Sequence, residues 1–132
     1  MDSFGRRPLA FLALPAAAQS GQLAGVLNAT LHEQGFDVKP SDIAAGTEWK
    51  AGIQDVLRRS DVVVADLSGA DPNVIFEVGL AFGMLKPVLL LSQDKEIASD
   101  IRAYQVARYR PDQIDLVRQY LALWLRDTMA TA

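Results

Sequence analysis

One glutamate stands alone in the run DPNVIFEVGLAFGMLKP, where Glu77 is the only charged residue between Asp71 and Lys86. A helix on a protein surface normally carries several charges on its solvent side, whereas a buried helix carries none. An unpaired buried carboxylate is costly or stays protonated, so such a group needs a partner or a function. We therefore expect either an ion pair between Glu77 and an arginine, such as Arg102 or Arg108, or a catalytic carboxyl group.

The residues around Glu77 favour a reactive carboxyl group. Asp71 and Pro72 read as the N-cap and the first residue of a helix, which puts Glu77 between one and two turns into that helix. Burial raises the pKa of a carboxyl group, a helix N-terminus lowers it, and neighbouring carboxylates such as Asp71 and Asp66 raise it again. Competing effects of this kind are typical of catalytic acids and nucleophiles.

Alternating strand and helix patterns surround this helix. Strands are predicted at residues 8–14, 36–40, 62–66, 87–91 and 106–109, and helices at 20–34, from 47 onward, from 72 to 86 and at 111–129. Residues 92–105 read as a loop or lid that contains a short helix. Strands separated by helices imply right-handed crossovers, hence an α/β fold in which about five parallel strands carry helices on both faces.

In such a sheet, ligands bind beyond the carboxyl ends of the strands. The loop after the predicted central strand contains Asp66, Ser68 and Asp71, so we expect these residues at the ligand edge. Structural roles are the alternative, with Asp71 as a helix cap and Asp66 as an acceptor for a neighbouring loop.

Two other positions are candidate ligand contacts. Ser20 and Gly21, at the start of the first predicted helix, offer an anion site. The preceding loop, PAAAQSGQ, lacks the arginine and the multiple glycines that would favour a 5′-phosphate. Trp49 either stacks on a base or belongs to the core.

The stretch SDVVVADLSGADPNVIFEVGLAFGMLKPVLLL resembles the core signature of nucleoside 2-deoxyribosyltransferase-like proteins. That signature is an aspartate-ended strand, a polar loop, the pattern N-V-x-x-E-x-G-x-A and a K-P-V strand. The segments FLALP and GTEWKAGIQDVLRRSD are similar to the family's first strand and second helix, so the resemblance covers most of residues 8–91. It implies a flavodoxin-like, doubly wound fold. TIR domains and TIR-like effectors share this architecture and a helix-borne catalytic glutamate.

The resemblance also implies a reaction. In these enzymes the helix glutamate attacks C1′ of the sugar of a nucleoside or nucleotide, and a base or water resolves the covalent intermediate. By position, Glu77 is the expected nucleophile, Asp71 holds the sugar and orients the nucleophile, and Asn73 supports the sugar or the loop. The TIR-like relatives make NAD a further substrate candidate, and no cofactor is implied.

One position departs from the family pattern. The enzymes usually carry an aspartate that helps to protonate the leaving base where this chain has Ile53. Asp55 lies about 200° further round the helix, at ~100° per residue, so it is not expected to substitute. Two hypotheses remain open: an enzyme that breaks an N-glycosidic bond, and a nucleotide-binding or signalling module in which Glu77 holds ribose hydroxyls.

The composition of the chain argues against several other classes of protein. The chain of 132 residues is expected to be a single domain, and its net charge of -3 without basic clusters argues against nucleic-acid binding. Zero cysteines and one histidine, His32, exclude a disulfide scaffold and a cysteine or histidine metal cluster.

The expected location and assembly follow from other features. No apolar run reaches the ~18 residues of a membrane span, and residues 9–14 read as a buried strand rather than as part of a secretion signal. We therefore expect a cytoplasmic protein. We also expect a homo-oligomer, because sites in the resembling families are often completed by a neighbouring subunit and because Gly79 and Gly83 permit close helix contact.

Overall fold

A computed structural model describes residues 6–18, 21–41, 49–95 and 105–130 of the chain. Its centre is a parallel five-stranded sheet in the order β2-β1-β3-β4-β5. The strands are β1 (Leu9–Ala13), β2 (Asp37–Pro40), β3 (Val62–Asp66), β4 (Val88–Ser92) and β5 (Val106–Arg108). The predicted parallel sheet, with 62–66 as its central strand and the short strands at its edges, is confirmed.

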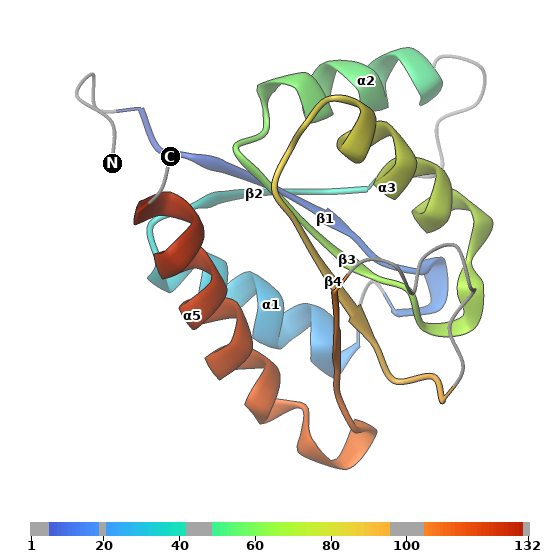
Figure 1. Cartoon of the computed structure of the whole chain (residues 1–132), viewed down its shortest axis with the longest axis vertical. Helices are drawn as coiled ribbons and strands as arrows, with labels where there is room; N and C mark the ends of the chain where they lie inside the picture. Colours follow the sequence, from blue (N-terminus) through green and yellow to red (C-terminus); the bar gives the residue numbers. More distant parts are fainter. Residues whose placement is uncertain (1–5, 19–20, 42–48, 96–104, 131–132) are drawn as a thin grey trace.

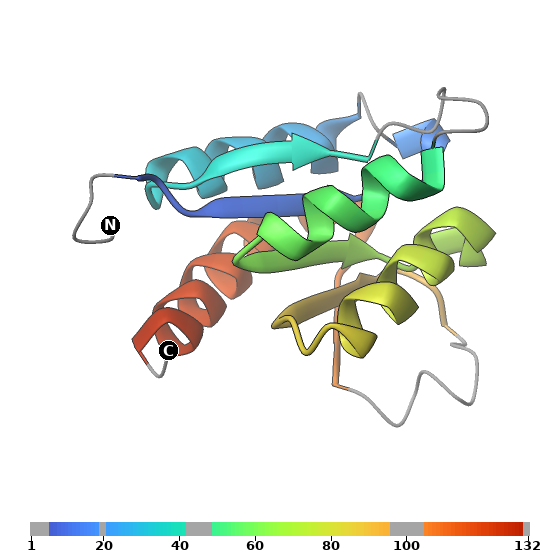
Figure 2. The same cartoon turned by 90° about the horizontal axis from the view of Figure 1, so that it is seen from above.

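Helices cover both faces of the sheet, as Figures 1 and 2 show. Helices α1 (Gln22–Glu33) and α5 (Asp115–Ala130) pack against each other on one face. Helices α2 (Trp49–Arg59) and α3 (Pro72–Gly83) pack together on the other. The expected doubly wound, flavodoxin-like arrangement is therefore present.

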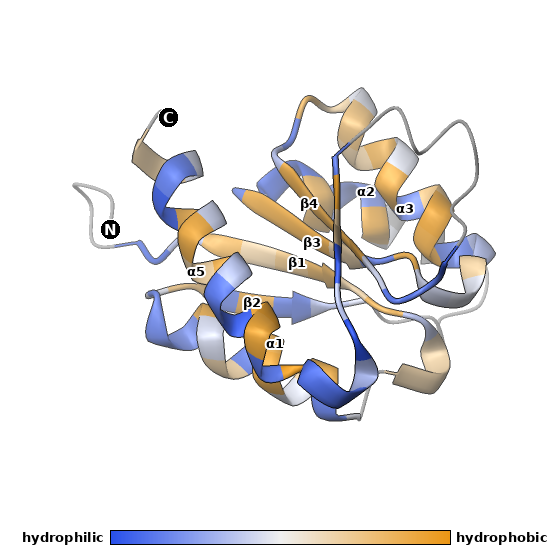
Figure 3. Ribbon diagram, turned by 60° about the horizontal axis from the view of Figure 1, so that its bottom comes forward, coloured by the Kyte–Doolittle hydropathy of each residue, from blue (hydrophilic) through white to orange (hydrophobic). Residues whose placement is uncertain are grey.

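The two helical layers are filled by alternate residues of the strands. Val62 and Val64 belong to the core cluster beneath α1 and α5, whereas Val63 and Ala65 belong to the cluster beneath α2 and α3. This follows from the two-residue period of a strand, which sends successive side chains to opposite faces. Figure 3 shows the result: apolar residues colour β1, β3 and β4, while the edge strand β2 is hydrophilic.

Glycine and proline set several element boundaries. Gly21 is the N-cap of α1, and Gly35, with φ +91°, turns the chain after α1 into β2. Pro40 ends β2, the edge strand, where its missing N–H breaks no ladder in the sheet interior.

The final helix begins later than the sequence pattern predicts. Pro111–Gln113 form a 3-10 turn, closed by the N–H of Gln113 donating to the carbonyl of Arg110, and α5 begins at Asp115. The apolar periodicity does not distinguish a 3-10 turn from the first turn of an α-helix, which explains the difference. The predictions for Thr47 and for most of the 92–105 segment fall outside the described residues.

No helix in the described part of the chain is both long and apolar enough to cross a membrane.

Candidate active site

Glu77 is buried inside the α2/α3 layer. Val74, Val78 and Ala81 of α3 pack into the apolar cluster on this face of the sheet, and Glu77 shares their buried side of the helix. The Glu77 side chain is 0% exposed. Its Oε2 accepts a hydrogen bond of 2.5 Å from Oγ of Ser41, whereas its Oε1 has no hydrogen-bond partner among the described residues.

Ser41 places this pair at the carboxyl edge of the sheet. The residue follows Pro40 at the end of β2, is itself buried, and its backbone N–H donates to the carbonyl of Leu12 in β1 at 3.0 Å. Since ligands of parallel sheets bind beyond the carboxyl ends of the strands, the carboxyl group of Glu77 lies on the side where a substrate is expected.

The surroundings shift the pKa of Glu77 upward. Burial is the largest cause, because it penalises the charged form. The hydrogen bond from Ser41 acts in the opposite direction by stabilising the carboxylate, and the negative charge of Asp71 raises the pKa further. The predicted effects of burial and of Asp71 on this pKa are therefore present, whereas the lowering effect comes from Ser41 rather than from the helix N-terminus, and Asp66 is not among the causes.

Asp71 caps the helix that carries Glu77. Its Oδ1 accepts the backbone N–H of Asn73 at 2.8 Å, and Pro72 is the first helical residue, as predicted. This is the structural role considered for Asp71, and it also holds the Asp71 charge near enough to Glu77 to affect its pKa. The sugar-binding roles of Asp71 and Asn73 stay predictions.

An arginine partner for Glu77 does not occur within the part of the chain that the structure describes. The guanidinium of Arg108 donates instead to the backbone carbonyls of Asp94, at 2.6 Å, and Lys95, at 3.1 Å. The other candidate, Arg102, lies outside the described residues. The described partner of this carboxyl group is a neutral hydroxyl.

Asp66 belongs to a separate polar cluster. Its Oδ1 accepts the backbone N–H of Ser68 at 3.1 Å and the Ser68 hydroxyl at 2.6 Å, and its Oδ2 accepts the Tyr109 hydroxyl at 3.0 Å. Burial is the main cause that raises the pKa of Tyr109 to about 12. Both carboxylate oxygens of Asp66 are thus engaged by neighbouring loops, which is the structural alternative considered for this residue.

A cavity of about 410 Å³ lies beside this cluster. Its lining includes Gly21, Asp66, Ser68, Asp94 and Tyr109, and its volume falls in the range of small-molecule sites. Three predicted ligand contacts, Gly21, Asp66 and Ser68, therefore line one hollow. Ser20 and the side chain of Trp49 lie outside what the structure describes.

The predicted site residues thus form two groups. Asp66, Ser68 and Gly21 line one cavity on the α1/α5 side of the sheet, whereas Glu77 and Asp71 lie with α3 on the opposite side and do not line that cavity. No group of three or more potential metal ligands occurs among the described residues.

The position that departs from the family pattern lies in the core. Ile53 of α2 packs with Leu57 in the apolar cluster beneath α2 and α3. Asp55 is exposed on the same helix and forms ion pairs with Arg58 and Arg59 at 3.7 and 3.2 Å. Asp55 is therefore turned toward other partners, in agreement with the expectation from helix geometry.

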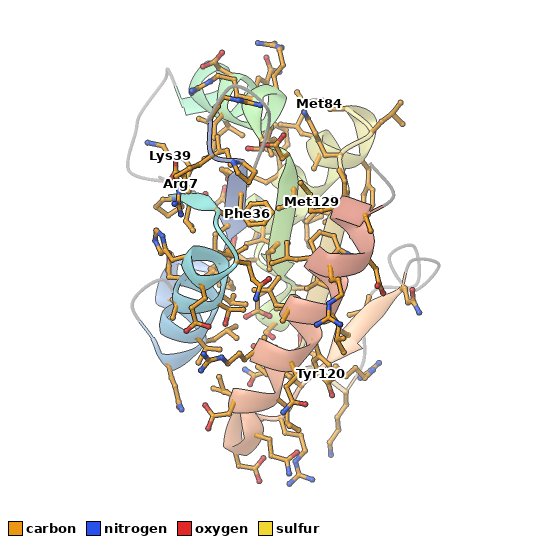
Figure 4. All side chains as sticks on the ribbon, turned by 90° about the vertical axis from the view of Figure 1, so that its left-hand side faces the viewer. Arg7, Phe36, Lys39, Met84, Tyr120 and Met129 are labelled. Atoms are coloured by element: carbon orange, nitrogen blue, oxygen red, sulfur yellow. The ribbon has the colours of Figure 1, made fainter. Side chains whose placement is uncertain are left out.

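Two shallow apolar hollows lie elsewhere on the surface. One, of about 410 Å³, follows the outer face of α3 and is lined by Ile75, Phe76, Gly79, Leu80, Gly83 and Met84. The other, of about 350 Å³, lies between the edge of the sheet and α5, with Tyr120 and Trp124 in its lining. Figure 4 labels one residue from each lining, Met84 after α3 and Tyr120 on α5.

Sequence reasoning missed Ser41 and Asp94. Ser41 belongs to no motif, and its contact with Glu77 depends on how β2 is placed relative to α3. Asp94 accepts the backbone N–H of Gly69 at 2.8 Å and so joins the loops after β3 and β4. Its place in the loop after a buried strand was a signal that could have found it.

Comparisons with known proteins identify the family and the fold of this chain. The model of a family described as nucleoside 2-deoxyribosyltransferase matches residues 11–117. None of the curated proteins matches the sequence significantly.

Among solved structures, a CMP N-glycosidase from Clostridium botulinum is similar, with 24% identity and a TM-score of 0.70 over 88% of this chain and 98% of that one. A 2-deoxyribosyltransferase from Bacillus psychrosaccharolyticus is 20% identical, with a TM-score of 0.56 over 81% and 90% of the two chains. A diflavin flavoprotein from Nostoc sp. is 12% identical, with a TM-score of 0.65 over 96% and 99%. At these identities, the structural likeness shows the fold alone.

Proposed function

Because this chain belongs to the nucleoside 2-deoxyribosyltransferase family, we propose that it cleaves or transfers the N-glycosidic bond of a nucleoside or nucleotide, with the Glu77 carboxylate as nucleophile. The state of this carboxyl group carries the proposal. It is buried at the carboxyl edge of the sheet, one oxygen is held by Ser41, and the other has no partner among the described residues. Buried polar atoms are nearly always satisfied, so an exception needs an explanation, and a catalytic role supplies one.

The reaction proceeds in two displacements at C1′ of the sugar. A lone pair of the carboxylate forms a bond to C1′ as the C1′–N bond breaks, and the electron pair of that bond leaves with the base. A proton from water neutralises a base that departs as an anion. Water or an acceptor base then attacks C1′, the electrons of the C1′–O bond return to Glu77, and the proton that the attacking molecule loses replaces the one taken from water by the departing base. We assign to Asp71 the role of holding sugar hydroxyls.

Only the ionised form of Glu77 can attack C1′. Burial raises the pKa of this carboxyl group above its ordinary value of 4.5. The rate of base release is therefore expected to rise with pH above that value, until Glu77 is fully ionised.

NAD hydrolysis of the TIR-like kind is a second candidate, and the surroundings of Ile53 favour it. The described side chains of α2 offer no acid to protonate a leaving base, because Ile53 is in the core and Asp55 is paired with arginines. The ring nitrogen of the nicotinamide in NAD is already positively charged. Nicotinamide therefore leaves as a neutral molecule without receiving a proton.

Base release from a panel of substrates tests these proposals. The protein is incubated with NAD, ribonucleosides, deoxyribonucleosides and their monophosphates, and free base is measured by chromatography. Glu77→Gln is expected to abolish release. Glu33→Gln is the matched control, since Glu33 is exposed on α1 and pairs with Arg118. Equal release by the Glu77→Gln variant and the parent would show that Glu77 is not the nucleophile.

A non-catalytic nucleotide-binding or signalling module, in which Glu77 holds ribose hydroxyls without turnover, is favoured by one observation: Ile53 lies in the apolar core at the position where the enzymes carry an acid. Binding of the sugar needs no group that protonates a leaving base, whereas departure of most bases does. If no member of the panel releases base but one raises the melting temperature, binding without turnover is the correct function.

Assembly and location complete the proposal. We propose a homo-oligomer formed through the apolar outer face of α3. That face combines the partly exposed side chain of Phe76 with Gly79 and Gly83, which have no side chain, so that two copies can fit together. The cytoplasmic location expected from the sequence stays a prediction.

A further inference from the structure

We infer that Ser41 is a positioning residue for the proposed reaction: its hydroxyl group fixes Oε2 of Glu77 and leaves Oε1 as the oxygen that bonds to C1′. The inference rests on the proposed function of Glu77. It assigns a role to a residue outside the sequence motif and gives different tasks to the two oxygens of one carboxyl group.

The contact between Ser41 and Glu77 is short and buried, and the backbone of Ser41 is held in place by its own hydrogen bond. The distance between Oγ and Oε2 is 2.5 Å, which lies at the short end of the range for O–H···O hydrogen bonds. Ser41 is 3% exposed, so water does not compete strongly for its hydroxyl. Its backbone N–H is bound to the carbonyl of Leu12, which fixes the end of β2 to the central part of the sheet.

The two carboxyl oxygens of Glu77 are therefore not equivalent. Oε2 accepts the Ser41 hydroxyl, and a lone pair used in that bond is not free to attack. Oε1 is buried and has no partner among the described residues, so its lone pairs remain available. In the first displacement, an Oε1 lone pair forms the bond to C1′, and the electron pair of the C1′–N bond leaves with the base. Water then attacks C1′, the electron pair of the C1′–Oε1 bond returns to the carboxylate, and the proton that this water loses balances the proton taken up by the departing base.

Ser41 also counteracts the groups that keep Glu77 protonated. Burial and the charge of Asp71 raise the pKa of Glu77, and the Ser41 hydroxyl lowers it. The elements packed against α3 add few other charges. Strands β1 and β4 contain no titratable residue, and Asp66 of β3 faces the other layer. On α2, Asp55 is exposed and paired with Arg58 and Arg59.

A second buried serine provides a control. Ser60 is 2% exposed, and its Oγ donates to the backbone carbonyl of Val56 at 2.7 Å. It resembles Ser41 in burial and in donating one hydrogen bond, but its acceptor is neutral and belongs to the backbone. Ser60→Ala therefore reports what the loss of a buried serine hydroxyl does when no nucleophile is involved.

The experiment measures the protonation of Glu77 and the release of base in the same set of variants. The sequence contains four glutamates, at positions 33, 48, 77 and 96. Labelling the glutamate side-chain carboxyl carbons with ¹³C therefore gives a simple spectrum, and Glu77→Gln identifies the signal of Glu77 by its loss. The pKa of Glu77 is then read in the parent and in Ser41→Ala, Ser41→Thr and Ser60→Ala. The pH profile of base release is recorded for the best substrate of the panel.

We expect Ser41→Ala to raise the pKa of Glu77, to move the acid side of the pH profile by the same amount, and to lower kcat at the optimum. A misplaced reacting group costs about 10²-fold in rate. Ser41→Thr, which keeps a hydroxyl, is expected to restore both properties, and Ser60→Ala to leave both unchanged.

Two other results would overturn the inference. If Ser41→Ala leaves the pKa of Glu77 and the profile as in the parent, Ser41 does not position the nucleophile. If activity falls without a change in that pKa, and Ser41→Thr does not restore it, the serine is structural. Both outcomes differ from failure of the proposed function, in which Glu77→Gln releases base as the parent does or the parent releases none.

Discussion

Asp66 and Glu77 face opposite layers of the sheet. Asp66 ends β3 on the side of Val62 and Val64, beneath α1 and α5, and it accepts hydrogen bonds from Ser68 and Tyr109. Glu77 lies in α3 on the other side and accepts from Ser41. The signature that contains both acids thus supplies two separate polar clusters at one edge of the sheet.

Because the two clusters are separate, a substitution at Tyr109 is not expected to alter the pKa of Glu77. Tyr109→Phe leaves Oδ2 of Asp66 without its donor, which is expected to cost about 1–3 kcal/mol of unfolding free energy. The cost is measured by denaturant unfolding, and the carboxyl carbon signal of Glu77 is expected to titrate as in the parent. A shifted Glu77 signal would show that the two clusters are coupled.

The raised pKa of Tyr109 also predicts that the folded protein becomes less stable at high pH. Its pKa is raised from 10.0 to about 12, so between these values the folded protein binds a proton that the unfolded chain has released. The unfolding free energy therefore decreases as pH rises from about 10 to about 12. Absorbance titration is expected to show a tyrosine that ionises near pH 12 in the parent and is lost in Tyr109→Phe.

The raised pKa of Glu77 predicts that the unfolding free energy depends on pH in the acid range. Its folded pKa is raised above 4.5, so this carboxyl group contributes most to stability below the unfolded pKa and makes the protein less stable as pH rises through the folded pKa. Each unit by which the pKa is raised corresponds to about 1.4 kcal/mol. The unfolding free energy of Glu77→Gln relative to the parent is therefore expected to increase with pH above 4.5 and then level off. A constant difference would mean that the pKa of Glu77 is not raised.

Much of the fold could be predicted because the apolar runs and the helix caps in the sequence match the strands and helices that the sheet requires. The apolar run around Val63 was long enough for a buried strand, and Asp71 with Pro72 marked the start of α3 by known capping chemistry. The side of the sheet on which Asp66 lies could also have been predicted. Val62, Val64 and Asp66 alternate along one strand and therefore share a face.

The contact between Ser41 and Glu77 could not be predicted in the same way. Ser41 follows a short edge strand and has no periodic or motif neighbour, and a serine there is compatible with an exposed loop. Its role depends on the distance between the end of β2 and the middle of α3, which is a property of the assembled sheet. The start of α5 was predicted wrongly for a local reason, the 3-10 turn at Pro111.

Asp71 combines a structural and an electrostatic role that two substitutions separate. Asp71→Ser keeps a hydroxyl acceptor for the N–H of Asn73 but removes the charge, so the pKa of Glu77 is expected to fall while stability changes little. Asp71→Ala removes the cap as well and is expected to cost about 1 kcal/mol. Denaturant unfolding and the ¹³C titration measure the two effects. If both variants leave the pKa of Glu77 unchanged, Asp71 does not act on it.

The apolar hollow on α3 predicts how copies of the chain associate. Phe76 is 37% exposed there, and the neighbouring Gly79 and Gly83 present no side chain, so Phe76 of one copy can pack over the glycines of another. Phe76→Asp puts a charge into this contact and is expected to shift the protein toward monomer in sedimentation velocity runs. Leu123→Asp on α5 is the matched control, because Leu123 is 52% exposed in the other apolar hollow. If Leu123→Asp dissociates the oligomer and Phe76→Asp does not, the copies meet through α5 rather than α3.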